Sequence, residues 1–291
     1  WETTTSNTRS MGISGQNIQV ESVGWWNVNN ALTRNASNSY SDWSMLSAVG
    51  RVIYNYDDRY MVTGTFRADG SSRFTNNKWG YFPSIAFAWT ASNEKFMEPY
   101  RDIVNHLKLR ASYGVIGNQD IAPYSTLALM SQTTTYFGSN TGVTGYWENT
   151  LATPDIKWEK TNQFDIGFDL GLWNNRLTLS LDYFDKRTTD ALLSTRLPNY
   201  LGGTSYLINA GEVSNRGLDF AISANVFSTN DFDWSTSINA TYLKNKVVKL
   251  TAQEPRLYSG VMPGICDDGT NIITEGEAIG SFYGYRWAGN D

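Results

Sequence analysis

The feature that most constrains this chain is a two-residue alternation of apolar and polar side chains, which recurs in eight stretches of about ten residues. In the clearest stretch, residues 161–172, phenylalanine, isoleucine and leucine take every second position from Phe164 onward. Such a pattern is typical of β-strands with one apolar and one polar face. The eight expected strands cover residues 43–56, 60–69, 81–90, 107–115, 161–172, 177–183, 217–226 and 234–242.

Two weaker strand candidates lie at residues 16–26 and 279–287, and residues 93–106 have the spacing of a short helix. The connections between strands segregate by length. Short turns join some strands, and long loops join others at 117–160, 188–216 and 245–278. Short turns at one end and long loops at the other are the plan of an outer-membrane barrel, whereas a soluble β-sandwich gives no reason for this segregation.

Aromatic residues gather at the ends of the expected strands. Tyr81 and Trp89 share one strand face and are eight residues apart, as are Trp234 and Tyr242. For a tilted strand this spacing spans about 20 Å of height, close to the apolar band of about 25 Å in membrane barrels. We therefore expect two rows at the membrane interfaces: Tyr56, Tyr60, Trp89, Trp173 and Trp234 on the short-turn side, and Tyr81, Tyr113, Tyr183 and Tyr242 on the long-loop side.

The composition argues against several classes of function. A formal net charge of −5 gives no basic surface for nucleic acid. The single cysteine, Cys266, and the single histidine, His106, exclude multi-cysteine metal clusters and most histidine chemistry. Asp267 and Asp268 are residues of the type found in calcium-binding loops, but the full spacing of such a loop is missing. Two interpretations therefore stay open, a calcium site and a solvated turn. We expect neither an enzyme nor a bound cofactor.

The polar strand faces and the long loops supply the candidate functional residues. Charged residues on the polar faces are expected to line a hydrated barrel interior: Arg51, Arg67, Asp69, Lys108, Arg110, Asp165 and Asp169. Aromatic rings in the loops are candidates for contact with substrate or partner, because flat rings stack on sugars and peptides. They are Tyr136, Phe137, Tyr146, Trp147, Tyr200, Tyr206 and Tyr258. Packing of one loop on another is the alternative role for these rings.

Several strings, taken together and in order, resemble the SusC/RagA family of TonB-dependent outer-membrane transporters. They are spread over most of the chain, which makes the match more specific than any one of them. The strings are GRVIYNY at 50–56, RADGSSRF at 67–74, WGYFPS at 79–84, EKFM at 94–97, LKLRASYG at 107–114, GNQD at 117–120, KWEKT at 157–161, NAGEV at 209–213, NRG at 215–217 and GSFYGY at 280–285.

The resemblance implies a 22-stranded antiparallel transmembrane β-barrel with an N-terminal plug, a TonB-binding segment and a SusD-like surface lipoprotein as a lid. It also implies import of nutrient oligomers, glycans first and peptides second, across the bacterial outer membrane. We expect residues 1–291 to be a partial barrel without plug or TonB-binding segment, with 93–106 as a periplasmic connection and the three long loops extracellular. The alternatives are a non-transporting receptor or adhesin barrel and a soluble carbohydrate-binding β domain.

Overall fold

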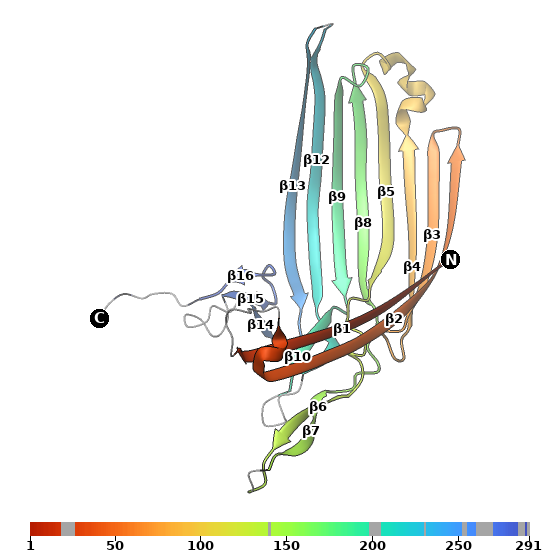
Figure 1. Ribbon diagram of the computed structural model, residues 1–291. Coiled ribbons are helices and arrows are strands. Elements are labelled where there is room, and N and C mark those ends of the chain that lie inside the picture. Colours follow the sequence, from red (N-terminus) through yellow and green to blue (C-terminus); the bar gives the residue numbers. More distant parts are fainter. Residues whose placement is uncertain are drawn as a thin grey trace.

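A computed structural model describes residues 1–18, 27–138, 141–197, 205–229, 231–251, 255–259, 270–284 and 289. Its main body is a nine-stranded antiparallel sheet, called the wall below, with the order β1-β2-β3-β4-β5-β8-β9-β12-β13 (Figure 1). Its strands are β1 (Glu2–Ile18), β2 (Ala31–Tyr56), β3 (Tyr60–Ser71), β4 (Trp79–Thr90), β5 (Val104–Asn118), β8 (Glu159–Leu172), β9 (Leu177–Thr189), β12 (Glu212–Ser228) and β13 (Asp233–Lys249).

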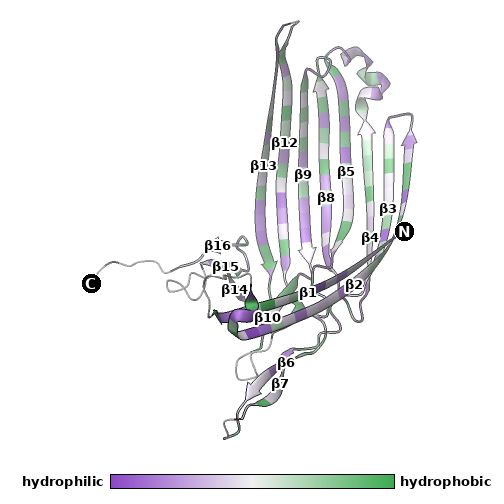
Figure 2. Cartoon of the chain, in the orientation of Figure 1, coloured by the Kyte–Doolittle hydropathy of each residue, from purple (hydrophilic) through white to green (hydrophobic). Residues whose placement is uncertain are grey.

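All eight strands expected from the sequence lie in the wall, which confirms the two-residue alternation as a strand signal. The register aligns polar positions across neighbouring strands, as where Ser112 on β5 lies beside Asp165 on β8. Apolar positions align in the same way, as where Tyr113 lies beside Phe164. Figure 2 shows hydrophobic and hydrophilic residues alternating along the strands. The wall therefore has one polar face and one apolar face.

The two ends of the wall differ. One end, the turn end, carries the tight connections β2–β3 and β8–β9 and lies at the top of Figure 1. The opposite end, the loop end, carries the shorter elements in two small sheets. These elements are β6 (Leu129–Thr135), β7 (Val143–Thr150), β10 (Leu192–Arg196) and β11 (Ser205–Asn209) in one sheet, and β14 (Arg256–Ser259), β15 (Asn271–Thr274) and β16 (Ser281–Phe282) in the other.

The longest strand, β2, belongs to two structures at once. Its second half, from Met45 onward, pairs with β3 in the wall. Its first half pairs with β1, and in Figure 1 the resulting β1–β2 ribbon runs across the loop end of the other strands. The helix η2 (Val28–Asn30) precedes β2 in this ribbon. The strand candidate at 16–26 overlaps β1 only at residues 16–18, and residues 19–26 lie outside the described part of the chain.

The connection at the turn end between β4 and β5 differs from the helix expected at 93–106. It contains two short 3₁₀ helices, η3 (Ala91–Asn93) and η4 (Lys95–Tyr100), and β5 begins at Val104. Glu94, between them, has an extended backbone, and Pro99 within η4 has no N–H for an α-helical hydrogen bond. Among the residues that the structure describes, no helix is long and apolar enough to cross a bilayer.

The described part of the chain buries a cluster of apolar side chains at the loop end, where Phe82 of β4 meets residues of the connections. The loop-end core consists of Phe74, Phe82, Ile121, Ile156 and Trp158, each at most 7 % exposed. The ring of Trp158 lies 5.2 Å from that of Phe74 and 5.5 Å, edge-on, from that of Phe82. By contrast, the apolar face of the wall stays open: Val52, for example, is 73 % exposed.

Candidate functional site

The polar face of the wall contains every charged residue that the sequence analysis assigned to a barrel interior. The register places Lys108 beside Asp169, and Arg51 beside Thr65. All seven predicted residues occupy this one face: Arg51, Arg67, Asp69, Lys108, Arg110, Asp165 and Asp169. Three recesses of about 860, 250 and 230 Å³ are lined mainly from this face. The polar face, with these recesses, thus extends from β2 to β13.

Arg110 joins two carboxylates from neighbouring strands. Its Nη2 donates hydrogen bonds of 3.0 Å to Asp169 and 3.0 Å to Asp182, and the Ser180 hydroxyl donates to Asp169 at 2.9 Å. A Cβ added at Gly167 would come within 1.9 Å of Asp182 Oδ1, so the glycine leaves room for this carboxylate. Asp182 was not among the predicted residues, although its alternation with the apolar residues of β9 places it on the polar face.

A second polar group lies nearer the loop end and lines the largest recess. Arg67 Nε donates to both carboxylate oxygens of Asp69, at 2.9 and 2.7 Å. Asp165 accepts hydrogen bonds from Gln163 at 2.9 Å and from Ser112 at 3.3 Å. Asp69 is buried, whereas the Arg67 side chain is partly exposed. These contacts hold the two carboxylates in fixed positions on the polar face.

Aromatic rings form a chain on the apolar face at the turn end. Tyr60 lies 6.5 Å from Tyr56 and 6.4 Å from Trp89, with the second pair stacked. Glu94 accepts hydrogen bonds from the Tyr60 hydroxyl at 2.7 Å and from Trp89 Nε1 at 3.3 Å. The hydrogen bond from Tyr60, helped by that from Trp89 and by the charge of Arg59, lowers the pKa of Glu94 below its usual value.

The other aromatics assigned to the two rows lie on wall strands or directly beside them. Trp173 lies just beyond the end of β8, and Trp234 lies near the start of β13. Towards the loop end, Tyr183 on β9 and Tyr242 on β13 flank Leu218 of β12 in register. The last two members of that row are Tyr81 and Tyr113, which are both exposed.

The loop aromatics divide by element. On the β6–β7 hairpin, Tyr146 and Trp147 are exposed, as are Tyr136 and Phe137 just after β6. The remaining candidates are Tyr206 on β11, which is half-buried, and Tyr258 on β14, whose ring lies 5.3 Å from that of Tyr283. Tyr200, Cys266, Asp267 and Asp268 lie outside the described residues, so their proposed roles stay predictions.

A meandering sheet with ordered charges on one face and open apolar side chains on the other defines the wall of a transmembrane β-barrel. The sequence agrees: residues 2–277 match the family model described as TonB dependent receptor-like, beta-barrel. The chain therefore belongs to the TonB-dependent receptor β-barrel family. This family comprises outer-membrane transporters and receptors rather than enzymes. The expected location, the outer membrane, is thereby confirmed.

Relatives and solved structures agree with this assignment. TonB-dependent receptor P3 of Formosa agariphila is 40 % identical over 260 residues, which cover 89 % of this chain and 26 % of the relative. TonB-dependent receptor SusC of Bacteroides thetaiotaomicron is 32 % identical over 252 residues, or 84 % of this chain and 25 % of SusC. The chain thus spans about a quarter of the length of these curated relatives.

Among solved structures, the RagAB peptide transporter superposes with a TM-score of 0.76 at 27 % identity, over 90 % of this chain and 28 % of its own. The closed-closed state of the RagAB peptide importer gives 0.79 at 25 % identity, over 99 % of this chain and 31 % of its own. These matches confirm the resemblance to the SusC/RagA family and the partial-barrel fold.

Proposed function

We propose that residues 1–291 are a section of the wall of an importer that takes up nutrient oligomers by TonB-dependent transport. Glycan oligomers are the first substrate class, as the SusC/RagA resemblance implies. Peptides are the second class, because a peptide transporter is among the similar solved structures. The partners are a SusD-like surface lipoprotein and TonB. The plug and the segment that contacts TonB are assigned to parts of the protein other than these residues.

One observation carries the proposal: the wall keeps large apolar side chains open on one face and ordered charges on the other. Ile85 and Ile238, on different strands, are 57 % and 58 % exposed. A soluble sheet would bury such a face against a second layer, whereas a barrel wall turns it to lipid. We therefore assign the apolar face to acyl chains and the polar face, with its seven predicted charges, to a water-filled interior.

The orientation follows from the two ends of the wall. Barrels of this class have short periplasmic turns and long extracellular loops. The turn end, with η3 and η4, is accordingly assigned to the periplasm, and the loop end to the cell surface. The two rows of aromatic residues then lie at the two membrane interfaces. The exposed rings of Tyr136, Tyr146 and Trp147 come to lie at the surface, where substrate and lid protein would meet them.

The test uses the complete protein in its host. Cells that produce it, and matched cells with the gene deleted, are offered fluorescent glycan oligomers and fluorescent peptides of similar size, with and without TonB. We expect uptake of glycan oligomers that disappears when either the gene or TonB is removed. Uptake of peptides alone would identify peptides, the second class, as the substrate. Surface binding without TonB-dependent uptake would overturn the proposal in favour of a receptor or adhesin.

A further inference from the structure

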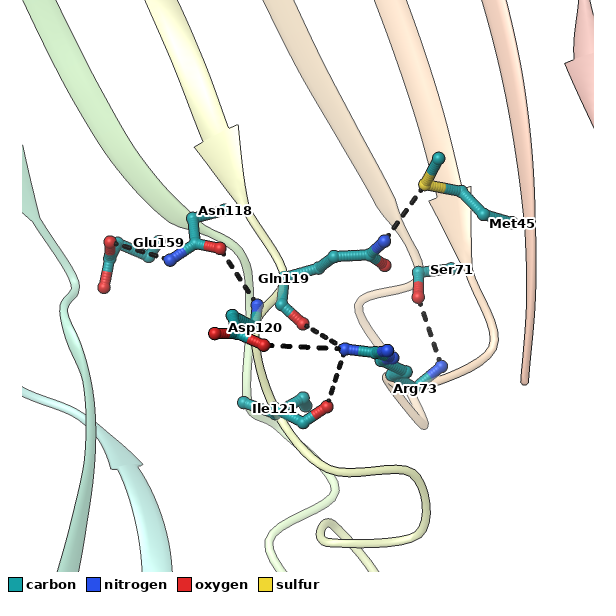
Figure 3. A network of polar contacts seen from close by, with 8 residues as sticks. All are labelled: Met45, Ser71, Arg73, Asn118, Gln119, Asp120, Ile121 and Glu159. Atoms are coloured by element: carbon teal, nitrogen blue, oxygen red, sulfur yellow. Dashed lines mark hydrogen bonds and ion pairs between the residues drawn. The ribbon is translucent and has the colours of Figure 1, made fainter. Parts of the chain in front are cut away.

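Two of the strings that carry the family resemblance, RADGSSRF at 67–74 and GNQD at 117–120, meet at one side chain. Arg73, in the β3–β4 connection, extends towards the segment that follows β5 (Figure 3). Its Nη1 donates hydrogen bonds to the backbone carbonyls of Ile121 at 2.9 Å and Gln119 at 3.4 Å. The same nitrogen lies 3.9 Å from a carboxylate oxygen of Asp120. One arginine thus holds the start of the long β5–β8 connection.

The flat face of the same guanidinium contacts a third segment. Its Cζ lies 4.3 Å from the centre of the Trp43 ring, on the part of β2 that pairs with β1. The backbones of Ser44 and Ser72 are joined nearby by a 2.9 Å hydrogen bond. Gln119 also donates from Nε2 to the sulfur of Met45 at 3.1 Å (Figure 3). The β1–β2 ribbon, the β3–β4 connection and the β5–β8 connection therefore meet around Arg73.

The two backbone carbonyls hold Arg73 more firmly than the carboxylate of Asp120 does. The Arg73 side chain is 15 % exposed, whereas that of Asp120 is 91 % exposed. A carboxylate in water at 3.9 Å contributes little to an ion pair. Hydrogen bonds from a buried charged donor are stronger, because the low local dielectric favours them. Nη1 alone reaches both carbonyls, while the planar guanidinium lies over the Trp43 ring, a contact that a lysine ammonium makes with less specificity.

The loop-end core lies next to these contacts and includes both ends of the β5–β8 connection. Ile121 near its start and Ile156 near its end are both buried there. Further along, the amide of Thr153 donates to the carbonyl of Thr126 at 3.0 Å. The β6–β7 hairpin, with Tyr146 and Trp147, is the part of the connection that lies between these two fixed ends. The hairpin also pairs with β11 through β7, so the start of the connection is one of several contacts that hold it.

We propose that Arg73 is a positioning residue, the centre of a clamp that joins the three segments and sets the place of the β6–β7 hairpin above the barrel mouth. Arg73 itself contacts no substrate. It acts through the backbone carbonyls of Gln119 and Ile121. The consequence for oligomer affinity rests on the proposed import function, whereas the clamp itself does not.

The clamp is tested by hydrogen exchange on the complete protein in detergent, with Arg73→Met compared with Asp120→Asn. Methionine keeps an apolar stem but donates no hydrogen bond. We expect the amides of residues 119–127 to exchange at least about tenfold faster in Arg73→Met, because hydrogen bonds to charged groups are strong enough to shift local opening by that factor. Asp120→Asn should exchange as the unaltered protein does, and Arg73→Lys should lie between the two.

Unchanged exchange at residues 119–127 in Arg73→Met would overturn the clamp. A large increase in Asp120→Asn would overturn the assignment to the carbonyls. Should Arg73→Met fail to assemble, Arg73→Lys decides: faster exchange confined to 119–127 supports the clamp, and an unaltered rate there refutes it.

The positioning role is tested by oligomer uptake. Arg73→Met should raise the half-saturating oligomer concentration several-fold and leave the maximal rate near that of the unaltered protein. Faster exchange with unaltered half-saturation would refute the positioning role. Absence of uptake by the unaltered protein would count against the proposed function alone, because the exchange result does not depend on substrate.

Discussion

The wall and the loop end use apolar side chains in opposite ways. In the wall, large apolar residues such as Val52 and Ile85 face outward and stay exposed. At the loop end, five apolar residues pack into a core in which Phe74 is fully buried. The wall therefore depends on surrounding lipid to cover its apolar surface, whereas the loop end carries its own core. A substitution in the core should therefore loosen the loop end, whereas a substitution on the lipid side should impair assembly of the barrel.

The largest effect is expected in the loop-end core. Trp158 is 4 % exposed, and its Nε1 donates to the Lys78 carbonyl at 3.1 Å. Trp158→Ala would leave a cavity and an unpaired carbonyl, with a cost of about 3–5 kcal/mol. We expect faster hydrogen exchange at residues 119–127 and 153–158, while exchange in the turn-end halves of the wall strands stays unchanged. The matched control is Trp147→Ala, an exposed tryptophan whose loss should alter exchange little. Equal loss of protection throughout the wall would show that the two regions form one cooperative unit.

The next effect concerns the lipid side of the wall. Phe168 lies on the apolar face of β8, midway between the two rows of aromatic residues. Phe168→Arg would place a charge against acyl chains, at a cost of about 2–4 kcal/mol near the midplane. Ala221→Arg is the control, because Ala221 lies on the polar face, where it lines a recess together with Asp169. We expect less folded barrel in outer-membrane extracts for the first variant only, measured by heat-dependent mobility in gels. Equal assembly of both variants would contradict the assignment of the two faces.

The smallest effect concerns the turn end and depends on pH. The pKa of Glu94 is lowered chiefly by the hydrogen bond from Tyr60, so ionisation of Glu94 favours the folded turn end. A group with a lowered folded pKa contributes stability above its unfolded pKa, which is 4.5 here, and loses that contribution as the pH falls through the folded value. We expect exchange in residues 91–103 to accelerate as the pH drops below 4.5, after correction for intrinsic rates. Glu94→Gln should remove this dependence, and a Glu94→Gln protein with the same pH profile would rule out Glu94 as its source.

Eight of the nine wall strands were predictable because water contacts one of their faces and lipid contacts the other. Along β8, water on one side and lipid on the other select alternating Asp or Gly and Phe, Ile or Leu. The alternation is absent from β1, the first strand in the wall's order, which is rich in threonine, serine and asparagine and pairs with the first half of β2. The two-residue alternation therefore marks the strands that have one apolar face and is absent from a strand that is polar on both faces.

The site was only partly predictable. The shared face of the seven predicted charges followed from alternation, and so does the place of Asp182 once β9 is paired with β8. The contact of Arg73 with Ile121 had no such signal, since the partners lie 48 residues apart and the acceptor is a backbone carbonyl. A carbonyl exists at every residue, so the sequence does not mark which one an arginine will reach.

The 26-residue length of β2 has a mechanical consequence. Met45 and its neighbours pair with β1 and β3 at the same time, so the outer ribbon and the bilayer-level ladder share one unbroken backbone. A strand is stiff along its axis, and here no loop separates the two halves. A force applied to the ribbon would therefore act directly on the hydrogen bonds between β2 and β3, with no flexible segment between them to absorb it.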